Sequence, residues 1–162
     1  MQKEGITFQP IGIIYSPFSE LESMPIQPTS EASGPGTVEI FGQFAEGLAD
    51  LEGFSHIILI YHLHEVRDTA LTVTPFLDVV ERGVFATRAP SRPNPIGMSV
   101  VNLLRVEELV LHVENLDVLD KTPLLDIKPY IPEFDYLPEV KIGWLEKNKA
   151  EIKSTLSDAR FK

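Results

Sequence analysis

The amino-acid sequence predicts a mainly β protein: a small closed β-barrel with short helices and an amphipathic C-terminal helix, outside the Rossmann class. Long proline-free stretches exist only at residues 36–74, 96–122 and 139–162. Long helices are confined to these stretches, because a proline inside a helix costs about 3 kcal/mol. Short segments that alternate apolar and polar residues indicate strands, and short strands joined by proline-rich turns are typical of barrels and sandwiches.

Alternation and β-branched residues predict strands at residues 12–15, 37–41, 56–61, 71–76 and 109–113. The segment at 56–61, HIILIY, is almost wholly apolar and is expected to be the buried strand of the set. Residues 43–48, between two of these strands, favour a short helix. Residues 16–36 are rich in proline and lack periodicity, so we expect a long loop there.

The C-terminal stretch is expected to form the one longer helix. Apolar residues recur near helical spacing between lysines and glutamates, at Trp144, Leu145, Ile152, Leu156 and Ala159. The predicted organisation is therefore a barrel domain over residues 1–140, followed by a helix over residues 141–162 that packs on the same domain or at a dimer interface. A chain of 162 residues is suited to a single hydrophobic core.

Composition limits the classes of function. The chain has no cysteine, which excludes disulfides, thiolate zinc sites and cysteine nucleophiles. It has no apolar run long enough for a membrane span and its first residues form no apolar signal core, so we expect a soluble, cytoplasmic protein with no membrane partner. The net charge of −10 opposes non-specific binding of nucleic acid, so RNA binding would need a local basic patch.

Several common enzyme motifs are missing. Gly34-Pro35-Gly36 precedes an expected strand and lacks the third glycine of a dinucleotide fingerprint, and no P-loop is present. Ser99 lacks the second glycine of a nucleophile elbow. On a strand, His62 and His64 would face one side like a metal-binding pair, but a third ligand at suitable spacing is missing, and a polar strand end at a barrel rim is the favoured explanation. We therefore predict no metal site.

The segment 83–97, GVFATRAPSRPNPIG, is predicted to be a functional site. Three prolines between residues 90 and 95 fix backbone angles, so the loop is rigid before a ligand binds. Rigidity lowers the entropic cost of binding. Arg88, Arg92 and Asn94 supply side-chain donors suited to a carboxylate or phosphate. The alternative is a stiff connector that carries solvated arginines.

A second candidate site is the segment 116–130, LDVLDKTPLLDIKPY. Asp126 and Lys128 would share one face of an extended segment, and Tyr130 would follow them if the extended run continues past Pro129. This row of acid, amine and phenol could orient a nucleophilic nitrogen or accept its proton, or it could be a surface ion pair worth less than about 1 kcal/mol. Spacing alone does not distinguish these readings.

Together these segments resemble the TrmO/TsaA family of tRNA-modifying enzymes. The resemblance covers roughly residues 8–132 and rests on the blocks IGIIYSP at 11–17, GFSH at 53–56, the loop at 83–97 and the segment ending in DIKPY at 126–130. It implies a small non-Rossmann β-barrel that binds S-adenosylmethionine and forms a homodimer with the cofactor near the subunit interface. It also implies N6-methylation of the threonylcarbamoyl-adenosine beside the anticodon of certain tRNAs.

The resemblance also implies roles for individual residues. Arg88 would bind the methionine carboxylate of S-adenosylmethionine, and Asp117 would accept hydrogen bonds from its ribose hydroxyls or amino group. The implied cofactor contacts are Gln27, Pro28, His64, Glu65, Arg88, Met98, Leu116, Asp117 and Val118. Arg92 and Asn94 are the candidates for binding substrate, and the candidates for holding the target amine are Asp126, Lys128 and Tyr130.

Two positions depart from the family pattern. Lys121 stands where the family commonly has glycine, so if that turn needs a positive φ the lysine must adopt it. The stretch at 25–28, PIQP, lacks the arginine that many members carry there. The alternatives are a methyltransferase with another, possibly small, substrate, a non-catalytic S-adenosylmethionine-binding protein, and a metalloenzyme built on His62 and His64.

Overall fold

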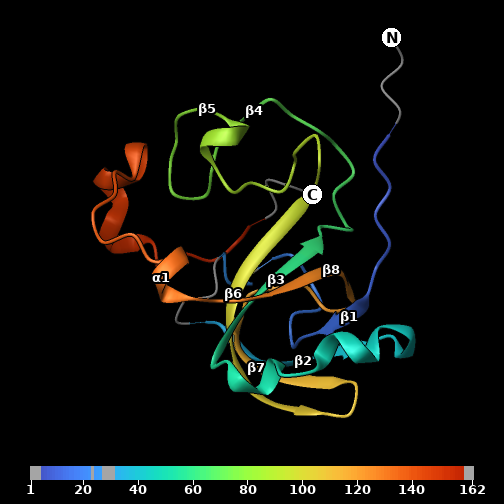
Figure 1. Ribbon diagram of the computed structural model, residues 1–162. Coiled ribbons are helices and arrows are strands. Elements are labelled where there is room, and N and C mark those ends of the chain that lie inside the picture. The colour runs from blue at the N-terminus through green and yellow to red at the C-terminus, as the bar shows by residue number, and fades with distance from the viewer. Residues whose placement is uncertain (1–4, 23, 27–31, 159–162) are drawn as a thin grey trace.

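The computed structural model describes residues 5–22, 24–26 and 32–158 (Figure 1). Six strands form a closed barrel in the order β1-β2-β7-β6-β3-β8, and all neighbours are antiparallel. They are β1 (Gly12–Tyr15), β2 (Gly34–Ile40), β3 (His56–His62), β6 (Ile96–Glu107), β7 (Val110–Leu116) and β8 (Thr122–Pro129). Because β8 pairs with both β3 and β1, the barrel wall is continuous. The prediction of a mainly β, closed barrel is confirmed.

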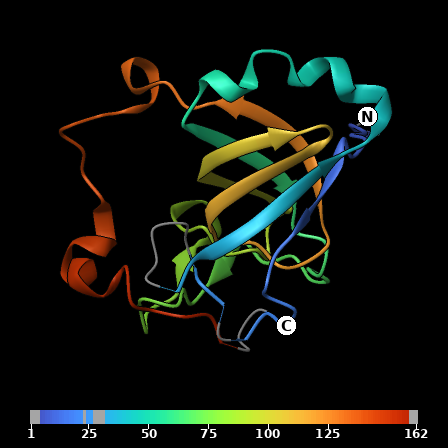
Figure 2. The ribbon, with the colours of Figure 1, turned by 90° about the horizontal axis from the view of Figure 1, so that it is seen from below.

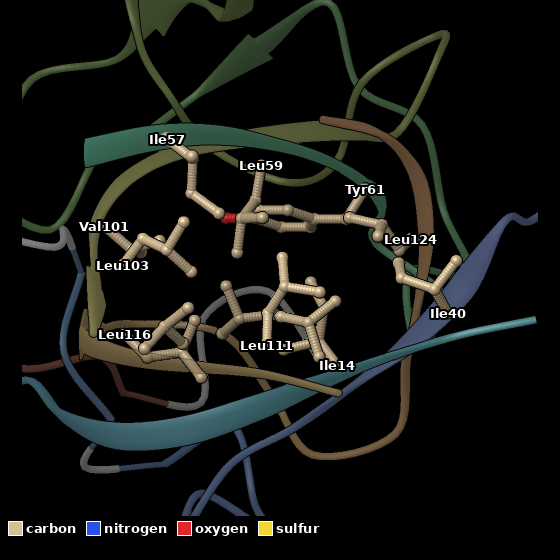
Figure 3. Packing of buried hydrophobic residues seen from close by; sticks show 13 residues of the cluster. Ile14, Ile40, Ile57, Leu59, Tyr61, Val101, Leu103, Leu111, Leu116 and Leu124 are labelled. Carbon is tan, nitrogen blue, oxygen red and sulfur yellow. The ribbon is translucent and has the colours of Figure 1, made fainter. Parts of the chain in front are cut away.

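The barrel interior is filled by the apolar side chains that the alternating pattern directs inward. Figure 3 shows them converging from the strands onto one interior, and they include Ile14, Val38, Ile57, Leu59, Val101, Leu111, Leu116 and Leu124. Each of these eight side chains is 0% exposed. Period-2 alternation along each strand therefore produces the core directly.

The barrel has two rims of different character. What we call the loop rim is where β1, β3 and β7 end and β2, β6 and β8 begin, so that residues 16–33, 63–95 and 117–121 connect strands there. What we call the hairpin rim is the opposite end, which carries the 3₁₀ helices η1 (Gly42–Leu48) and η2 (Leu51–Gly53) and the turn between β6 and β7. In Figure 1 the loop rim is at the top.

The longest connection of the loop rim, residues 63–95, has structure of its own. It contains a two-stranded sheet of β4 (Thr72–Val73) and β5 (Arg82–Gly83), followed by the 3₁₀ helix η3 (Val84–Ala86). A small cluster of Val73, Val84 and Ala89 is buried beneath it. The strand expected at 71–76 is therefore much shorter than predicted, because Pro75 cannot continue the ladder.

Two strands exceed what the sequence indicated. β6 runs over twelve residues from the end of the proline-rich loop, and β8 covers the segment in which only Asp126 to Lys128 was expected to be extended. Both strands contain register shifts against a neighbour, between Leu103 and Arg105 on β6 and opposite the step from Ile60 to Tyr61 on β8. Such bulges interrupt simple alternation and so weaken the strand signal in the sequence.

The prediction of a continuous amphipathic C-terminal helix is wrong. After the four-residue α1 (Pro132–Asp135), the segment forms a 3₁₀ helix, η4 (Gly143–Glu151), which is kinked at Asn148 (φ −116°, ψ 19°) and buries no residue completely. Figure 2 shows it to one side of the barrel, away from the strands. It is tied to the 63–95 connection, because Trp144 Nε1 donates to Ala86 O at 2.8 Å and Asn148 donates to Leu77 O. These tertiary contacts override the helical spacing.

Candidate cofactor and substrate site

The loop rim brings together most of the residues expected to bind the cofactor. His64 and Glu65 follow the end of β3, and Arg88 lies in the connection that leads to β6. Leu116 ends β7, and Asp117 and Val118 begin the turn into β8. Gln27 and Pro28 lie outside the described residues. Met98 stands apart from this group, on the outer face of β6, and is 50% exposed.

A buried hydrogen-bonded chain lies where the barrel interior meets the loop rim. The Tyr61 hydroxyl lies 2.8 Å from Ser99 Oγ, and Ser99 Oγ donates to Asp117 Oδ1 at 2.5 Å. The three residues are 6, 1 and 9% exposed and come from β3, from β6 and from the residue after β7. Three separate strands thus place one carboxylate at the top of the core.

The environment of Asp117 changes its acidity. Burial raises the pKa of its carboxyl group to about 6, because a low-dielectric surrounding disfavours the charged form. The hydrogen bond from Ser99 and the positive charge of Arg88 lower this pKa and partly offset the effect of burial. Burial also raises the pKa of the Tyr61 phenol, with a further contribution from the charge of Asp117. Buried groups with perturbed pKa values are typical of functional sites.

The absence of a side chain at Gly97 leaves the space that the Tyr61 ring occupies. The two residues are register partners between β6 and β3, and a Cβ atom at position 97 would lie 2.1 Å from Cε2 of the Tyr61 ring. The aromatic ring therefore lies directly across the glycine. This contact gives a physical reason for the glycine that ends the segment RPNPIG.

The turn that carries Asp117 is tied to the first strand. Ser16 Oγ donates to Val118 O at 2.6 Å, and the Ser16 amide donates to Asp120 Oδ1 at 3.0 Å. The serine of the opening IGIIYSP block therefore holds the β7–β8 turn. Lys121 in this turn has a φ of 61°, so the lysine adopts the left-handed conformation for which glycine is better suited.

His64 faces the same turn. Its Nδ1 lies 3.4 Å from Thr122 Oγ1, and the Thr122 hydroxyl donates to Leu119 O at 2.7 Å. Since the single hydroxyl proton is used on that carbonyl, His64 Nδ1 is the donor in the contact with Thr122. His64 Nε2 lies 3.6 Å from Glu65 Oε1. The ring is thereby oriented at the loop rim.

The proline-rich loop is held from within by Arg92. Its Nη1 donates to the carbonyl oxygens of Val84, Thr87 and Ala89 at 3.2, 2.9 and 3.2 Å. Arg88 and Asn94, by contrast, are exposed. Of the arginines predicted to bind ligand, Arg92 uses at least one nitrogen to stiffen the loop, and Arg88 presents its guanidinium at the surface. The interpretation of a rigid loop gains support from these contacts, whereas a substrate-binding role for Arg92 and Asn94 stays a prediction.

Asp126, Lys128 and Tyr130 are not brought to the buried carboxylate. Lys128 Nζ lies 2.7 Å from Asp126 Oδ2, and the two side chains are 59 and 45% exposed on the outer wall of the barrel. The extended run ends at Pro129, and Tyr130 packs its ring 6.2 Å from that of His56 near the hairpin rim. Across β3, Asp126 shares a row with Ile60 and Met98.

The histidine pair does not form a metal-binding face. β3 ends at the exposed His62, and His64 lies in the turn beyond it, so the two do not alternate along one strand. Within the described part of the chain, no three histidine, cysteine, aspartate or glutamate residues cluster closely enough to hold a metal ion. In the same residues, no helix has the length and hydrophobicity needed to span a membrane.

Two residues of the site were missed by reasoning from sequence. Tyr61 was read only as part of an apolar strand, and Ser99 only as a rejected nucleophile. The available signal was a serine at an inward-facing position of a strand otherwise filled by Val101 and Leu103. A buried hydroxyl needs a partner, and that requirement indicates a second polar group nearby.

Comparisons with known proteins agree with this geometry. The family model for the tRNA-methyltransferase O N-terminal domain matches residues 13–136. A probable S-adenosyl-L-methionine-binding protein of Pyrococcus abyssi is 53% identical over 156 residues, covering 96% of this chain and 85% of its own. The tRNA (adenine(37)-N6)-methyltransferase of Escherichia coli is 36% identical over 153 residues, covering 88% of this chain and 65% of its own.

The fold is shared with a solved structure. The crystal structure of TrmO from Pseudomonas aeruginosa superposes with a TM-score of 0.71 and 38% identity over 87% of this chain. This chain spans 63% of that protein's length. With a family model matched over most of the barrel and relatives above 30% identity across nearly the whole chain, the protein belongs to the tRNA-methyltransferase O N-terminal domain family.

Proposed function

We propose that this protein is an S-adenosylmethionine-dependent methyltransferase that methylates N6 of the threonylcarbamoyl-adenosine beside the anticodon of tRNA. The observation that carries the proposal is the assembly of Asp117, Arg88 and His64 at one rim of a family barrel. The E. coli and human relatives are named tRNA (adenine(37)-N6)-methyltransferases, and the P. abyssi relative is named for binding S-adenosyl-L-methionine.

The donor set at the loop rim fits the cofactor. The exposed Arg88 guanidinium suits the methionine carboxylate, which it can bind through two hydrogen bonds. One carboxylate oxygen of Asp117 accepts the hydrogen bond from Ser99. The carboxylate also suits hydrogen bonds from ribose hydroxyls or from the cofactor's ammonium group. The side chains of Leu116 and Val118 belong to the core, so these two residues would contribute their backbone groups.

When bound, S-adenosylmethionine supplies a methyl group activated on a sulfonium. The chain's own task is then to hold the acceptor nitrogen in line with that methyl group, since positioning accounts for most of the rate in such a transfer. Asp126 is the proposed acceptor of the amine proton. Adjacent strands lie about 4.8 Å apart, so Asp126 stands about 10 Å from Met98 along their shared row. Asp126 can accept that proton only where the bound amine reaches this outer wall.

The proposal includes a homodimer. The outer wall around Met98 exposes apolar side chains, with Ile96 40% and Leu104 53% accessible, and the segment after β8 exposes Phe134 and Leu137 at 76 and 69%. Exposed apolar groups of this density are typical of surfaces that meet a partner. A second copy over this wall would exclude water from the row containing Asp126. We further propose that the protein acts in the cytoplasm, where its tRNA substrate would be met.

A tRNA substrate requires a basic surface on a chain of net charge −10. Four arginines, at 67, 82, 88 and 92, lie in the connection 63–95, while Arg105 lies on β6 toward the hairpin rim. Arg82 is paired with Asp78 at 2.7 Å. Arg82 and Arg92 already bind groups of the protein itself, so fewer arginines are available for RNA. A methyltransferase with a smaller substrate is therefore the second candidate.

Calorimetry with S-adenosylmethionine tests the cofactor assignment. Wild-type protein is expected to bind, and Arg88→Ala is expected to weaken binding at least tenfold through loss of a charge-assisted pair. Arg105→Ala is the matched control, since that arginine is also exposed and lies near the other rim. Absence of binding by the wild type would remove the proposal altogether.

Nucleoside mass spectrometry tests the substrate. Incubation with S-adenosylmethionine and tRNA that carries threonylcarbamoyl-adenosine should produce the N6-methylated nucleoside, and deletion of the gene should abolish it in cells. Asp126→Ala is expected to lower kcat without changing cofactor affinity. Full turnover by this variant would show that Asp126 and Lys128 form only a surface ion pair.

A further inference from the structure

The hydrogen bonds that link Tyr61, Ser99 and Asp117 all run in one donor-to-acceptor direction. An ionised Asp117 can only accept, so the single hydroxyl proton of Ser99 is committed to Asp117 Oδ1, at 2.5 Å. In the contact of 2.8 Å between Tyr61 and Ser99, the phenol is therefore the donor. Both protons point toward the carboxylate, and each donation strengthens the next, because polarised hydrogen bonds in a low-dielectric interior reinforce one another.

The hydrogen-bonded side chains are also held in fixed positions. The Tyr61 ring is held across Gly97, where even a methyl group would overlap it, and Ser99 is almost wholly buried between the strands. Tyr61, Ser99 and Asp117 are 6, 1 and 9% exposed, and of the three Asp117 is the one that begins a connection of the loop rim. The charge of Arg88 lowers the pKa of both Asp117 and Tyr61. Because Ser99 bridges the other two side chains, Tyr61 can act on Asp117 through Ser99.

We propose that Tyr61, acting through Ser99, is a positioning residue that keeps the Asp117 carboxylate ionised and oriented for the cofactor. The inference rests on the proposed function, since it takes Asp117 as a cofactor contact. Without the chain, burial alone would favour a neutral Asp117 that could rotate and that could no longer attract an ammonium group. The charged or titratable groups that act on Asp117 are Arg88 from the 63–95 connection and Tyr61 from β3.

A double-mutant cycle on cofactor affinity tests the relay. Affinity for S-adenosylmethionine is measured by calorimetry for wild type, Tyr61→Phe, Ser99→Ala and the double variant. A buried hydrogen bond contributes about 1 kcal/mol, so Tyr61→Phe is expected to weaken binding about fivefold and Ser99→Ala about tenfold. If Tyr61 works through Ser99, the double variant binds as Ser99→Ala does. Additive losses, or no loss in Tyr61→Phe, would overturn the proposal.

The pH dependence of binding separates positioning from packing. Loss of the Ser99 donor raises the pKa of Asp117 further, so the pH at which binding falls to half should move upward in Ser99→Ala and, by a smaller amount, in Tyr61→Phe. A purely structural role would lower thermal stability and leave this midpoint unchanged, which would also refute the proposal. Arg88 is present in every variant, so its charge does not contribute to the difference.

Controls keep the outcomes distinguishable. Tyr136→Phe removes the same hydroxyl from a tyrosine that is 64% exposed and should leave affinity and midpoint unchanged. If Ser99→Ala does not fold, the midpoint in Tyr61→Phe alone still decides the question, because the phenyl ring preserves the packing on Gly97. Failure of the wild type to bind S-adenosylmethionine would reject the proposed function, whereas normal wild-type binding with unaltered variants would reject only the relay.

Discussion

At the hairpin rim, β6 and β7 are joined by a turn at residues 108–109, whereas at the loop rim β3 and β6 are joined by residues 63–95. The two rims also differ in how many buried polar groups they hold. The buried polar residues of the described chain, Ser99, Asp117 and Thr122, all lie at or beside the loop rim. One barrel thus concentrates its buried polar groups at one rim, as expected where rigid strands position functional loops.

The largest expected difference between the rims comes from adding a single methyl group. Gly97→Ala places Cβ against the Tyr61 ring, which must leave its position and break the chain to Asp117. We expect a loss of about 2 to 3 kcal/mol in the free energy of unfolding, from overpacking, and loss of cofactor binding. Gly47→Ala in η1 is the control, because nothing lies within 4 Å of its Cβ position. Equal losses of stability for Gly97→Ala and Gly47→Ala in denaturant melts would contradict the contrast between the two rims.

The buried carboxylate should make stability depend on pH. The pKa of Asp117 is raised in the fold from 3.8 to about 6, so the folded state holds its proton in a range where the unfolded chain has released it. Its stabilising contribution is complete below the unfolded pKa and is lost as pH rises through the folded pKa. Relative to Asp117→Asn, the wild type should lose about 2 kcal/mol between pH 4 and pH 7. Parallel stability curves for the two proteins would show that the carboxyl group titrates normally.

The C-terminal segment is expected to support the loop rim with a smaller effect. Trp144 donates to Ala86 O and lies under Arg82, whose guanidinium carbon is 5.6 Å from the indole centroid, while Ser157 exchanges hydrogen bonds with the backbone of Met24. Trp144→Ala should speed amide exchange in residues 77–88 and weaken cofactor affinity about threefold, the cost of one lost hydrogen bond. Phe8→Ala, which removes an aromatic ring that is 63% exposed in the N-terminal segment, should change neither measurement.

The smallest expected effect is one that both rims share. Lys121 at the loop rim and Glu108 at the hairpin rim have φ values of 61° and 54°. Glycine adopts this conformation without the side-chain penalty, so Lys121→Gly and Glu108→Gly should each raise the free energy of unfolding by about 1 kcal/mol. Urea melts measure both. A gain at only one position would mean that the lysine or glutamate side chain makes a compensating contribution there.

Local sequence signals predicted what depends on neighbours in the chain. Alternation located β1, β2, β3 and β7, and the three prolines before Gly97 indicated a rigid loop, because both depend on backbone preferences over a few residues. The positive φ at Lys121 agrees with the family resemblance, in which glycine is common at that position, and lysine itself gives no local signal of it. The extent of β6 and the failure of the C-terminal helix were not predicted, because bulges and contacts with residues 77–86 decide them.

The sequence alone therefore determined a mainly β barrel, a rigid arginine-bearing loop at 83–97 and membership of a family that the comparisons confirm. The tertiary structure decided which polar groups act together. It joined Tyr61, Ser99 and Asp117 into one buried chain, turned Arg92 inward and Arg88 outward, and separated Asp126 and Lys128 onto the outer wall. The reason is that a hydrogen bond between strands depends on register and burial, and residues 38 positions apart carry no local signal of their contact.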